Sequence, residues 1–161
     1  TQDEDLGGGR IIGEACHFID LITFLVGAAP VSMSAHALPN NGKYREDNVS
    51  MTFTFPDGSL GVVDYLANGD KSMPKERLEV FCEGMVAVLD DYVSLSVVKD
   101  GKRKVENMAQ DKGWKAEMTA IASAIKNGGE PPIPYEQIIG VTKATFAAVE
   151  SIRSKSTVEI K

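Results

Sequence analysis

The chain has 161 residues, of which 43% are hydrophobic and 25% are charged, a balance that excludes a disordered or fibrous protein. Acidic residues outnumber Lys and Arg by 23 to 17, and the one basic run, at positions 99–104, is typical of a solvated hairpin tip, so nucleic acid is not an expected partner. The two cysteines have no CxxC spacing and no apolar run reaches about 20 residues, which argues against a disulfide framework and a membrane span and favours the cytoplasm.

The amino-terminal residues are acidic and polar, unlike a signal peptide, and they do not begin with methionine. We therefore expect the chain to be part of a longer protein. Its length is typical of one compact domain, and we predict a single domain over residues 1–161.

The first predicted element is a helix over residues 12–26. Apolar residues recur there at helical intervals, three glycines at positions 7–9 precede it, and Gly27 is a natural stop. After it, residues 31–38 alternate between polar and apolar side chains, which predicts a half-buried strand.

Three hairpins are predicted next. The first pairs residues 48–55 with 60–66 around a Pro-Asp-Gly turn. The second turns through Glu83 and Gly84, and the third through Asp100 and Gly101. Consecutive hairpins build antiparallel sheet, because parallel neighbours need long crossover connections.

The last third of the chain is predicted to form two helices separated by the extended linker EPPIP. The first helix carries one apolar stripe: Trp114, Met118, Ile121, Ala122 and Ile125. The second is expected to turn the following side chains inward: Ile138, Ile139, Thr142, Phe146, Val149 and Ile152. The final residues, TVEIK, are expected to add a short closing strand.

This order of elements predicts an α+β fold, with a mostly antiparallel sheet of about six strands and helices on one face. The other face of the sheet is left open and needs water, a second subunit or another domain to cover it. We expect this open face to serve oligomerisation.

The first predicted helix carries an unusual polar strip. Residues three apart share a helix face, so Glu14, His17 and Asp20 are expected to project together. Carboxylates beside a histidine stabilise its imidazolium form and its tautomer, which suits a general acid or base. From the spacing alone, the interpretation that the strip of an amphipathic helix simply faces solvent is favoured.

The sequence gives less support to a metal site, a nucleotide-binding site or a nucleophilic active site. Cys16 adjoins His17 but points about 100° away from it on a helix, so a metal site is not expected. Trp114 could line a pocket or simply pack. The glycines before the first helix do not follow an apolar strand, and we find no dinucleotide fingerprint, P-loop or GxSxG motif.

Three stretches carry a resemblance to a known family. GGGRIIGEACHFIDLITFLVG resembles the opening of the second domain of the Gfo/Idh/MocA oxidoreductases, the family of glucose-fructose oxidoreductase and inositol dehydrogenase. ERLEVFCEGMVAVLDDY resembles a strand pair of that domain, and DKGWKAEMTAIASAIKNGGEPPIPYEQIIGVTKATFAAVESIRS resembles its closing helix, linker and helix. The three stretches stand in the family's order and cover most of the chain.

The resemblance implies a two-domain enzyme whose N-terminal Rossmann domain, which holds NAD or NADP, is absent from this chain. The present chain would bind a sugar, polyol or sugar-nucleotide substrate and form a homodimer or homotetramer through its sheet. The sequence is most similar to the branch of the family whose members occur in polysaccharide and sugar-nucleotide gene contexts. Because the redox cofactor belongs to the missing domain, the isolated chain is expected to be inactive.

The resemblance also assigns roles to residues. His17 matches the family's histidine, so it would exchange a proton with the substrate oxygen, and Asp20 would orient the helix or the ring. Arg10, Lys112 and Trp114 are the candidates for substrate binding. Many members have an aspartate four residues before the histidine, where this chain has Gly13, and we hypothesise that Glu14 takes its place. The alternative to an enzyme is a non-catalytic scaffold that uses the sheet only for assembly.

Overall fold

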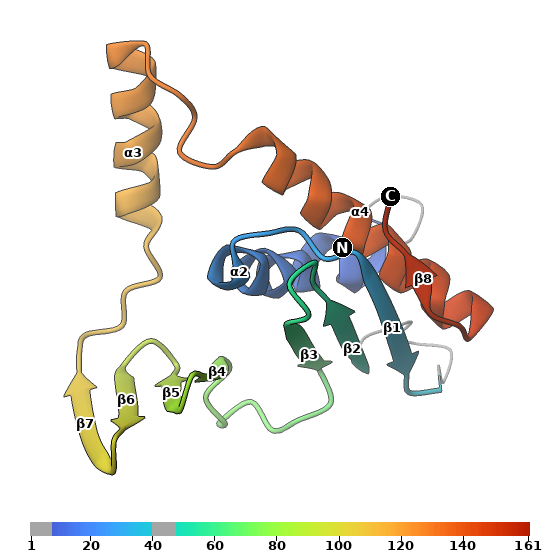
Figure 1. Cartoon of the computed structure of the whole chain (residues 1–161), viewed down its shortest axis with the longest axis horizontal. Helices are drawn as coiled ribbons and strands as arrows, with labels where there is room; N and C mark the ends of the chain where they lie inside the picture. Colours follow the sequence, from blue (N-terminus) through green and yellow to red (C-terminus); the bar gives the residue numbers. More distant parts are fainter. Residues whose placement is uncertain (1–7, 40–47) are drawn as a thin grey trace. The chain divides into compact units, whose positions relative to one another are not determined.

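The computed structural model of the chain describes residues 8–39 and 48–161, and it divides the chain into two compact units (Figure 1). Unit 1 contains Thr1–Asn68 and Ile133–Lys161, and unit 2 contains Gly69–Pro132. Gly7, the first of the three glycines that precede the first predicted helix, lies outside the described residues. No helix of the described ranges is long and apolar enough to cross a membrane.

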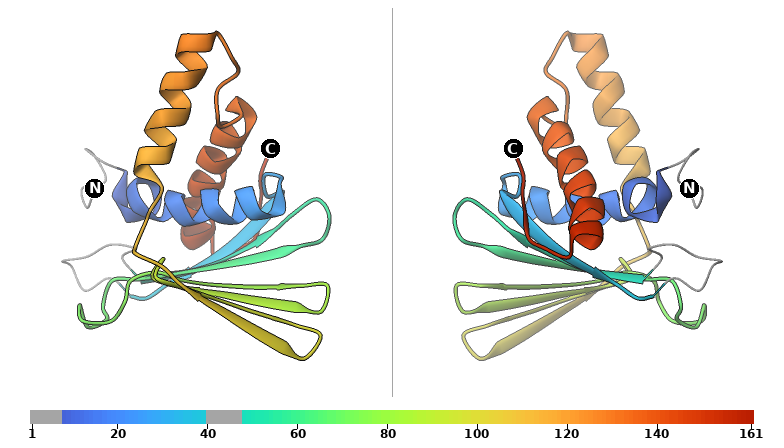
Figure 2. Two further views of the ribbon diagram at one scale, coloured as in Figure 1. Left: turned by 90° about the vertical axis from the view of Figure 1, so that its left-hand side faces the viewer. Right: turned by 90° about the vertical axis from the view of Figure 1, so that its right-hand side faces the viewer.

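Unit 1 holds a four-stranded antiparallel sheet in the order β3-β2-β1-β8. Its strands are β1 (Ser32–Ala37), β2 (Asn48–Thr54), β3 (Leu60–Leu66) and β8 (Val158–Glu159). Its helical elements are the π-helical turn η1 (Ile11–Ala15), α2 (Cys16–Val26) and α4 (Tyr135–Ser154). The helices lie on one face of this sheet, as Figure 2 shows for α2 and α4.

Unit 2 is a four-stranded antiparallel meander in the order β4-β5-β6-β7, followed by one helix. The strands are β4 (Arg77–Cys82), β5 (Met85–Asp90), β6 (Ser94–Lys99) and β7 (Lys102–Asn107), and the helix is α3 (Trp114–Asn127). The predicted turns at Glu83–Gly84 and Asp100–Gly101 are confirmed. All four of these residues have positive φ, the conformation that two-residue hairpins require.

The predicted α+β class with antiparallel sheet is confirmed, and the strand count differs from the predicted number of about six. Residues 8–39 and 48–161 contain eight strands, which are assigned to two four-stranded sheets, one in each unit. Neighbouring hairpins were expected to continue one sheet, whereas the described strands are assigned to one sheet of four in each unit. The connection between β3 and β4 is not a tight turn: Asp70 and Ser72 form a local turn of their own within it.

The buried hydrophobic core lies entirely within unit 1, as far as the described residues go. In the sheet it takes alternate positions, Met33 and Ala35 on β1 and Met51 and Phe53 on β2, while the intervening side chains point to the other face. Strand periodicity therefore separates a covered face from an open one in unit 1. The apolar stripe predicted for α3 is not buried, and Trp114 is 75% exposed.

Small residues, not large ones, form the buried side of α4. Ile138 and Phe146, two of the predicted inward residues, are exposed, with Phe146 at 55%. The buried positions are Gly140, Val141, Ala144, Thr145, Ala147, Ala148 and Ser151. A Cβ atom on Gly140 would lie 2.6 Å from the Cβ of Ala29, so the helix approaches the loop after α2 at a distance that only glycine permits.

Ser151 joins α4 to the sheet, because its hydroxyl bridges the backbone of β1 and the backbone just before β8. The β1–β8 pairing ends at Met33 and Val158, and two more residues in the same register would place Ala35 opposite Ser156. The Ser151 hydroxyl stands in that place: its Oγ accepts a hydrogen bond from the Ala35 N–H at 2.9 Å and donates one to the Ser156 carbonyl at 2.6 Å. Ser151 is 1% exposed and Ala35 is also buried, so the Ala35 N–H depends on this hydroxyl for its partner.

Candidate functional site

The candidate site begins where the chain enters its first helix. Gly8 and Gly9 have φ of 70° and 84°, the left-handed conformation that glycine adopts without strain. The next turn, η1, is a π-helix, and the Cys16 N–H donates to the Ile11 carbonyl five residues back. Single π-turns of this kind are frequent at functional sites.

The π-turn changes how the predicted polar strip is arranged. Glu14 lies inside the wide turn, whereas His17 and Asp20 lie on the regular helix α2. Glu14 and Asp20 are half-buried and His17 is exposed. In the part of the chain that the structure describes, neither Glu14 nor His17 makes a side-chain hydrogen bond or ion pair.

Asp20 is the member of the strip that has a partner. Its Oδ1 accepts a hydrogen bond from Nε2 of Gln137, at 3.0 Å, in a partly buried position. Gln137 lies in the first turn of α4, so this bond ties the middle of α2 to the start of α4. Sequence reasoning missed Gln137, because the two residues are separated by most of the chain.

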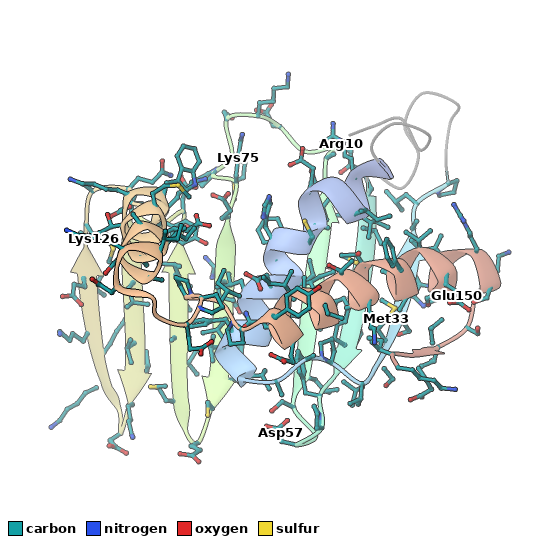
Figure 3. All side chains as sticks on the ribbon, turned by 90° about the horizontal axis from the view of Figure 1, so that it is seen from above. Arg10, Met33, Asp57, Lys75, Lys126 and Glu150 are labelled. Carbon is teal, nitrogen blue, oxygen red and sulfur yellow. The ribbon has the colours of Figure 1, made fainter. Side chains whose placement is uncertain are left out.

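Arg10 is held at the start of the same helical segment. Its Nη1 donates to the hydroxyl of Tyr65 on β3, at 3.2 Å. The Tyr65 ring in turn lies 6.2 Å from the ring of Phe18 on α2, centroid to centroid. Arg10 therefore lies at the end of β3 that is remote from the turn containing Asp57, as Figure 3 shows.

The face of α2 that carries His17 also carries apolar residues. Leu21 and Phe24 follow His17 at intervals of four and seven residues, which places the three on one side of the helix. Phe24 is 69% exposed, and the adjacent Leu25 is 47% exposed. Exposed apolar surface marks sites of contact, so this face of α2 differs from a polar surface that contacts only solvent.

Lys112 and Trp114, two of the predicted substrate-binding residues, lie in unit 2. The Lys112 ammonium donates to both carboxylate oxygens of Glu76, at 2.8 and 2.7 Å, and lies 5.9 Å from the centre of the Tyr92 ring. The hydrogen bond to Glu76 raises the pKa of Lys112, so this side chain stays charged. Trp114 is the first residue of α3.

Cys16, the residue before His17, is half-buried, and burial raises the pKa of its thiol. It is therefore a thiol rather than a thiolate at neutral pH, and it is not activated as a nucleophile. Among residues 8–39 and 48–161, no group of three His, Cys, Asp or Glu side chains is arranged to hold a metal ion.

These features define an α+β domain in which α2 presents a face with both ionisable and apolar side chains, and hydrogen bonds to β3 and α4 hold this helical segment in place. The model of the oxidoreductase family's C-terminal alpha/beta domain matches residues 1–160. The chain belongs to the Gfo/Idh/MocA oxidoreductase family.

Solved structures of oxidoreductases share this fold. The aldose-aldose oxidoreductase from Caulobacter crescentus, complexed with glycerol, is 20% identical with a TM-score of 0.79, over 98% of this chain and 50% of that one. UDP-N-acetylglucosamine 3-dehydrogenase GnnA from Acidithiobacillus ferrooxidans is 18% identical, with a TM-score of 0.74, over 94% and 49%. An Agrobacterium radiobacter oxidoreductase in complex with NAD+, L-tartaric acid and magnesium is 18% identical, with a TM-score of 0.77, over 91% and 48%.

At these identities the similarity establishes the fold alone. The chain spans about half the length of the three structures. No curated protein sequence matches it.

Proposed function

We propose that this chain is the substrate-binding and proton-transfer domain of an NAD(P)-dependent oxidoreductase that acts on a sugar, a polyol or a sugar nucleotide. The observation that carries the proposal is the placement of His17. It is an exposed imidazole on a helical segment held in two places, at its start by the bond from Arg10 to Tyr65 and in the middle of α2 by the bond from Gln137 to Asp20. A proton donor or acceptor needs such a fixed position to reach a substrate oxygen in one geometry.

The chemistry divides between the two halves of the proposed enzyme. A nicotinamide cofactor supplies the hydride acceptor or donor, and we expect the N-terminal domain to hold it. In the described residues, Gly8 and Gly9 lead into a π-turn rather than directly into a regular α-helix. When an alcohol is oxidised to a carbonyl, its hydroxyl proton must leave as the C–H hydride departs, and His17 accepts that proton at its imidazole nitrogen.

The remaining residues position the histidine and the substrate. Asp20 holds α2 against α4 through Gln137, so it acts on the orientation of the helix. Arg10 and Trp114 are proposed to contact the substrate. Lys112 is proposed to do so as well, and the substrate would then compete with Glu76 for its ammonium group.

The substrate class is supported by the names of two relatives. One is an aldose-aldose oxidoreductase and the other a UDP-N-acetylglucosamine 3-dehydrogenase, and both act on sugars by name. We extend that class to this chain. We also propose a cytoplasmic homodimer or homotetramer assembled through the open face of the β1–β3 sheet.

The experiment that tests the function uses the full-length protein with NAD or NADP. Nicotinamide absorbance is followed against a panel of sugars, polyols and sugar nucleotides. We expect turnover with at least one substrate and none with the isolated 161-residue chain. Specific binding of such ligands without any absorbance change would favour a non-catalytic scaffold instead.

Glu14→Gln tests whether Glu14 replaces the family's aspartate. The amide keeps the size of the side chain but removes its charge, so we expect kcat to fall by about tenfold or more while KM changes little. Steady-state kinetics of the full-length enzyme measure both constants. An unchanged kcat would dismiss the role, and a change confined to KM would assign Glu14 to substrate binding.

A further inference from the structure

In unit 2, where every residue is described, three hairpin turns join the four strands, and one of them differs from the others in composition. The turns at Glu83–Gly84 and Asp100–Gly101 have glycine at the second position, where φ is 76° and 70°. The turn between β5 and β6 has Asp91 and Tyr92 in the same left-handed region, with φ of 45° and 57°. A tyrosine therefore occupies the position at which the two neighbouring turns have glycine.

The conformation of Tyr92 goes against the preference of such a turn. Glycine adopts the left-handed region without strain, whereas a bulky residue is rarely found there. Residues held in conformations of this kind concentrate at functional sites, where the position of the side chain matters more than the backbone cost. The turn itself does not explain the tyrosine, so the explanation must lie in its side chain.

Two other segments of unit 2 hold this turn in place. The Val93 N–H donates to the Asp90 carbonyl at 2.9 Å and closes the turn. The Asp91 N–H donates to the backbone carbonyl of Glu76, just before β4, at 2.7 Å. The Asp91 carbonyl accepts a hydrogen bond from Nε2 of Gln110, after β7, at 3.0 Å. The segments on either side of the meander therefore meet at this turn and fix it.

The same segments bring a charged pair to the Tyr92 ring. The Lys112 ammonium lies 5.9 Å from the centre of that half-buried ring, and it donates to both carboxylate oxygens of Glu76 at 2.8 and 2.7 Å. The side chains of Lys112 and Glu76 are 33% and 23% exposed. An aromatic ring, an ammonium and a carboxylate are thus gathered in one partly buried cluster.

The charges in this cluster indicate which kind of ligand it suits. The hydrogen bond and the charge of Glu76, and then the charge of Asp91, raise the pKa of Lys112, so carboxylates of unit 2 already balance its ammonium. A phosphate or a carboxylate would be repelled by these side chains. A hydroxyl group would not be, because each Glu76 oxygen keeps a lone pair and the ammonium has a third N–H.

We propose that Tyr92 and Glu76 complete, together with Lys112, a subsite for an uncharged, hydroxyl-bearing part of the substrate. The Tyr92 ring packs against the C–H face of a sugar or polyol, and Glu76 and Lys112 bond to its hydroxyl groups. An apolar ring with a few convergent polar groups is the usual composition of a small-molecule site. The inference rests on the proposed function, in which Lys112 contacts the substrate, and it adds the chemical class of the part that is contacted.

Tyr92→Gly in the full-length enzyme is the first test. The substitution removes the ring and gives the turn the residue that its backbone prefers. We expect KM to rise about tenfold and kcat to change by less than about twofold, because a contact made equally before and during the reaction affects binding alone. Tm should not fall, since the strain at this position is relieved. Steady-state kinetics and thermal unfolding measure these quantities.

Gly101→Tyr is the matched control. It places a tyrosine at the equivalent left-handed position of the turn between β6 and β7, where φ is 70°. We expect this variant to melt at a lower temperature with an unchanged KM, the reverse of the result for Tyr92→Gly.

Glu76→Gln tests the class of the ligand. The amide keeps the size of the side chain but replaces a charged acceptor oxygen with an NH₂ group, so an uncharged, hydroxyl-bearing ligand should bind less tightly and KM should rise by about threefold or more. An anionic ligand should bind more tightly, because a negative charge is removed and the Lys112 ammonium is released. An unchanged or lowered KM would therefore overturn the proposal.

Binding measured by calorimetry separates this inference from the proposed function. The full-length protein is titrated with the same panel of sugars, polyols and sugar nucleotides, and Tyr92→Gly should weaken the binding of the members that bind by about tenfold. Binding that Tyr92→Gly leaves unchanged, or no binding by any member, would overturn the subsite. An enzyme whose KM is unaffected by Tyr92→Gly refutes only this inference, and a protein that binds a sugar through Tyr92 without hydride transfer refutes only the proposed function.

Discussion

Replacing His17 with alanine in the full-length enzyme is expected to lower kcat by about 10²–10⁴-fold, the range that a positioned general acid or base contributes. The fold should be preserved, because the His17 side chain is exposed and has no hydrogen-bond partner in the described part of the chain. Steady-state nicotinamide absorbance measures kcat, and circular dichroism verifies the fold.

His36→Ala is the matched control for this experiment. His36 is the second of the two histidines in the chain, and it is exposed on the open face of the sheet, opposite Ser50 on β2. Its replacement should leave kcat unchanged. Equal kcat values for His17→Ala and the unmodified enzyme would remove the proton-transfer role and support the scaffold alternative.

Ser151→Ala is expected to produce the largest loss of stability. The substitution leaves the buried Ala35 N–H without its partner, and a buried group left unsatisfied costs about 1–3 kcal/mol, whereas Ser156 is exposed and water can replace the lost bond to its carbonyl. The free energy of unfolding should therefore fall by about 1–3 kcal/mol, and Tm by about 2–12 °C. Thermal unfolding followed by circular dichroism measures the shift.

Ser154→Ala provides the comparison on the same helix. The Ser154 hydroxyl lies on the surface, 2.8 Å from the Ser156 hydroxyl, and its removal should change the stability by no more than about 0.5 kcal/mol. If the two variants melted at the same temperature, the Ser151 bridge would not be a significant source of stability.

Much of the secondary structure could be predicted because its signals are local. The turns at Glu83–Gly84 and Asp100–Gly101 need residues that accept positive φ, and the sequence places glycine at the second position of each. Gly27 likewise ends α2 in the left-handed conformation, with its N–H bonded to the Thr23 carbonyl. Such features depend on a few adjacent residues, so no tertiary information is needed to find them.

The errors concern long-range packing. Hydrophobic periodicity pointed to large residues such as Phe146 as the buried side of α4, but a helix this close to its neighbours buries Gly140 and a row of alanines instead. Periodicity ranks side chains by hydrophobicity and contains no information on how closely two elements approach. The number of strands in each sheet has the same origin, since no local signal states how many strands a sheet contains.

The candidate site was predictable in composition but not in geometry. Glu14, His17 and Asp20 were identified from their spacing, and all three lie on the first helical segment. The bond from Gln137 to Asp20 and the bond from Arg10 to Tyr65 connect positions far apart in the chain, and no sequence motif announces them.

The wide turn at Ile11–Ala15 also bears on attempts to transplant this strip into another scaffold. A designer who copied residues 11–20 onto a regular α-helix would preserve every interval in the sequence, yet would change the angle between the glutamate and the histidine about the helix axis. A faithful graft must carry the extra residue of that turn, together with the pair of left-handed glycines that lead into it.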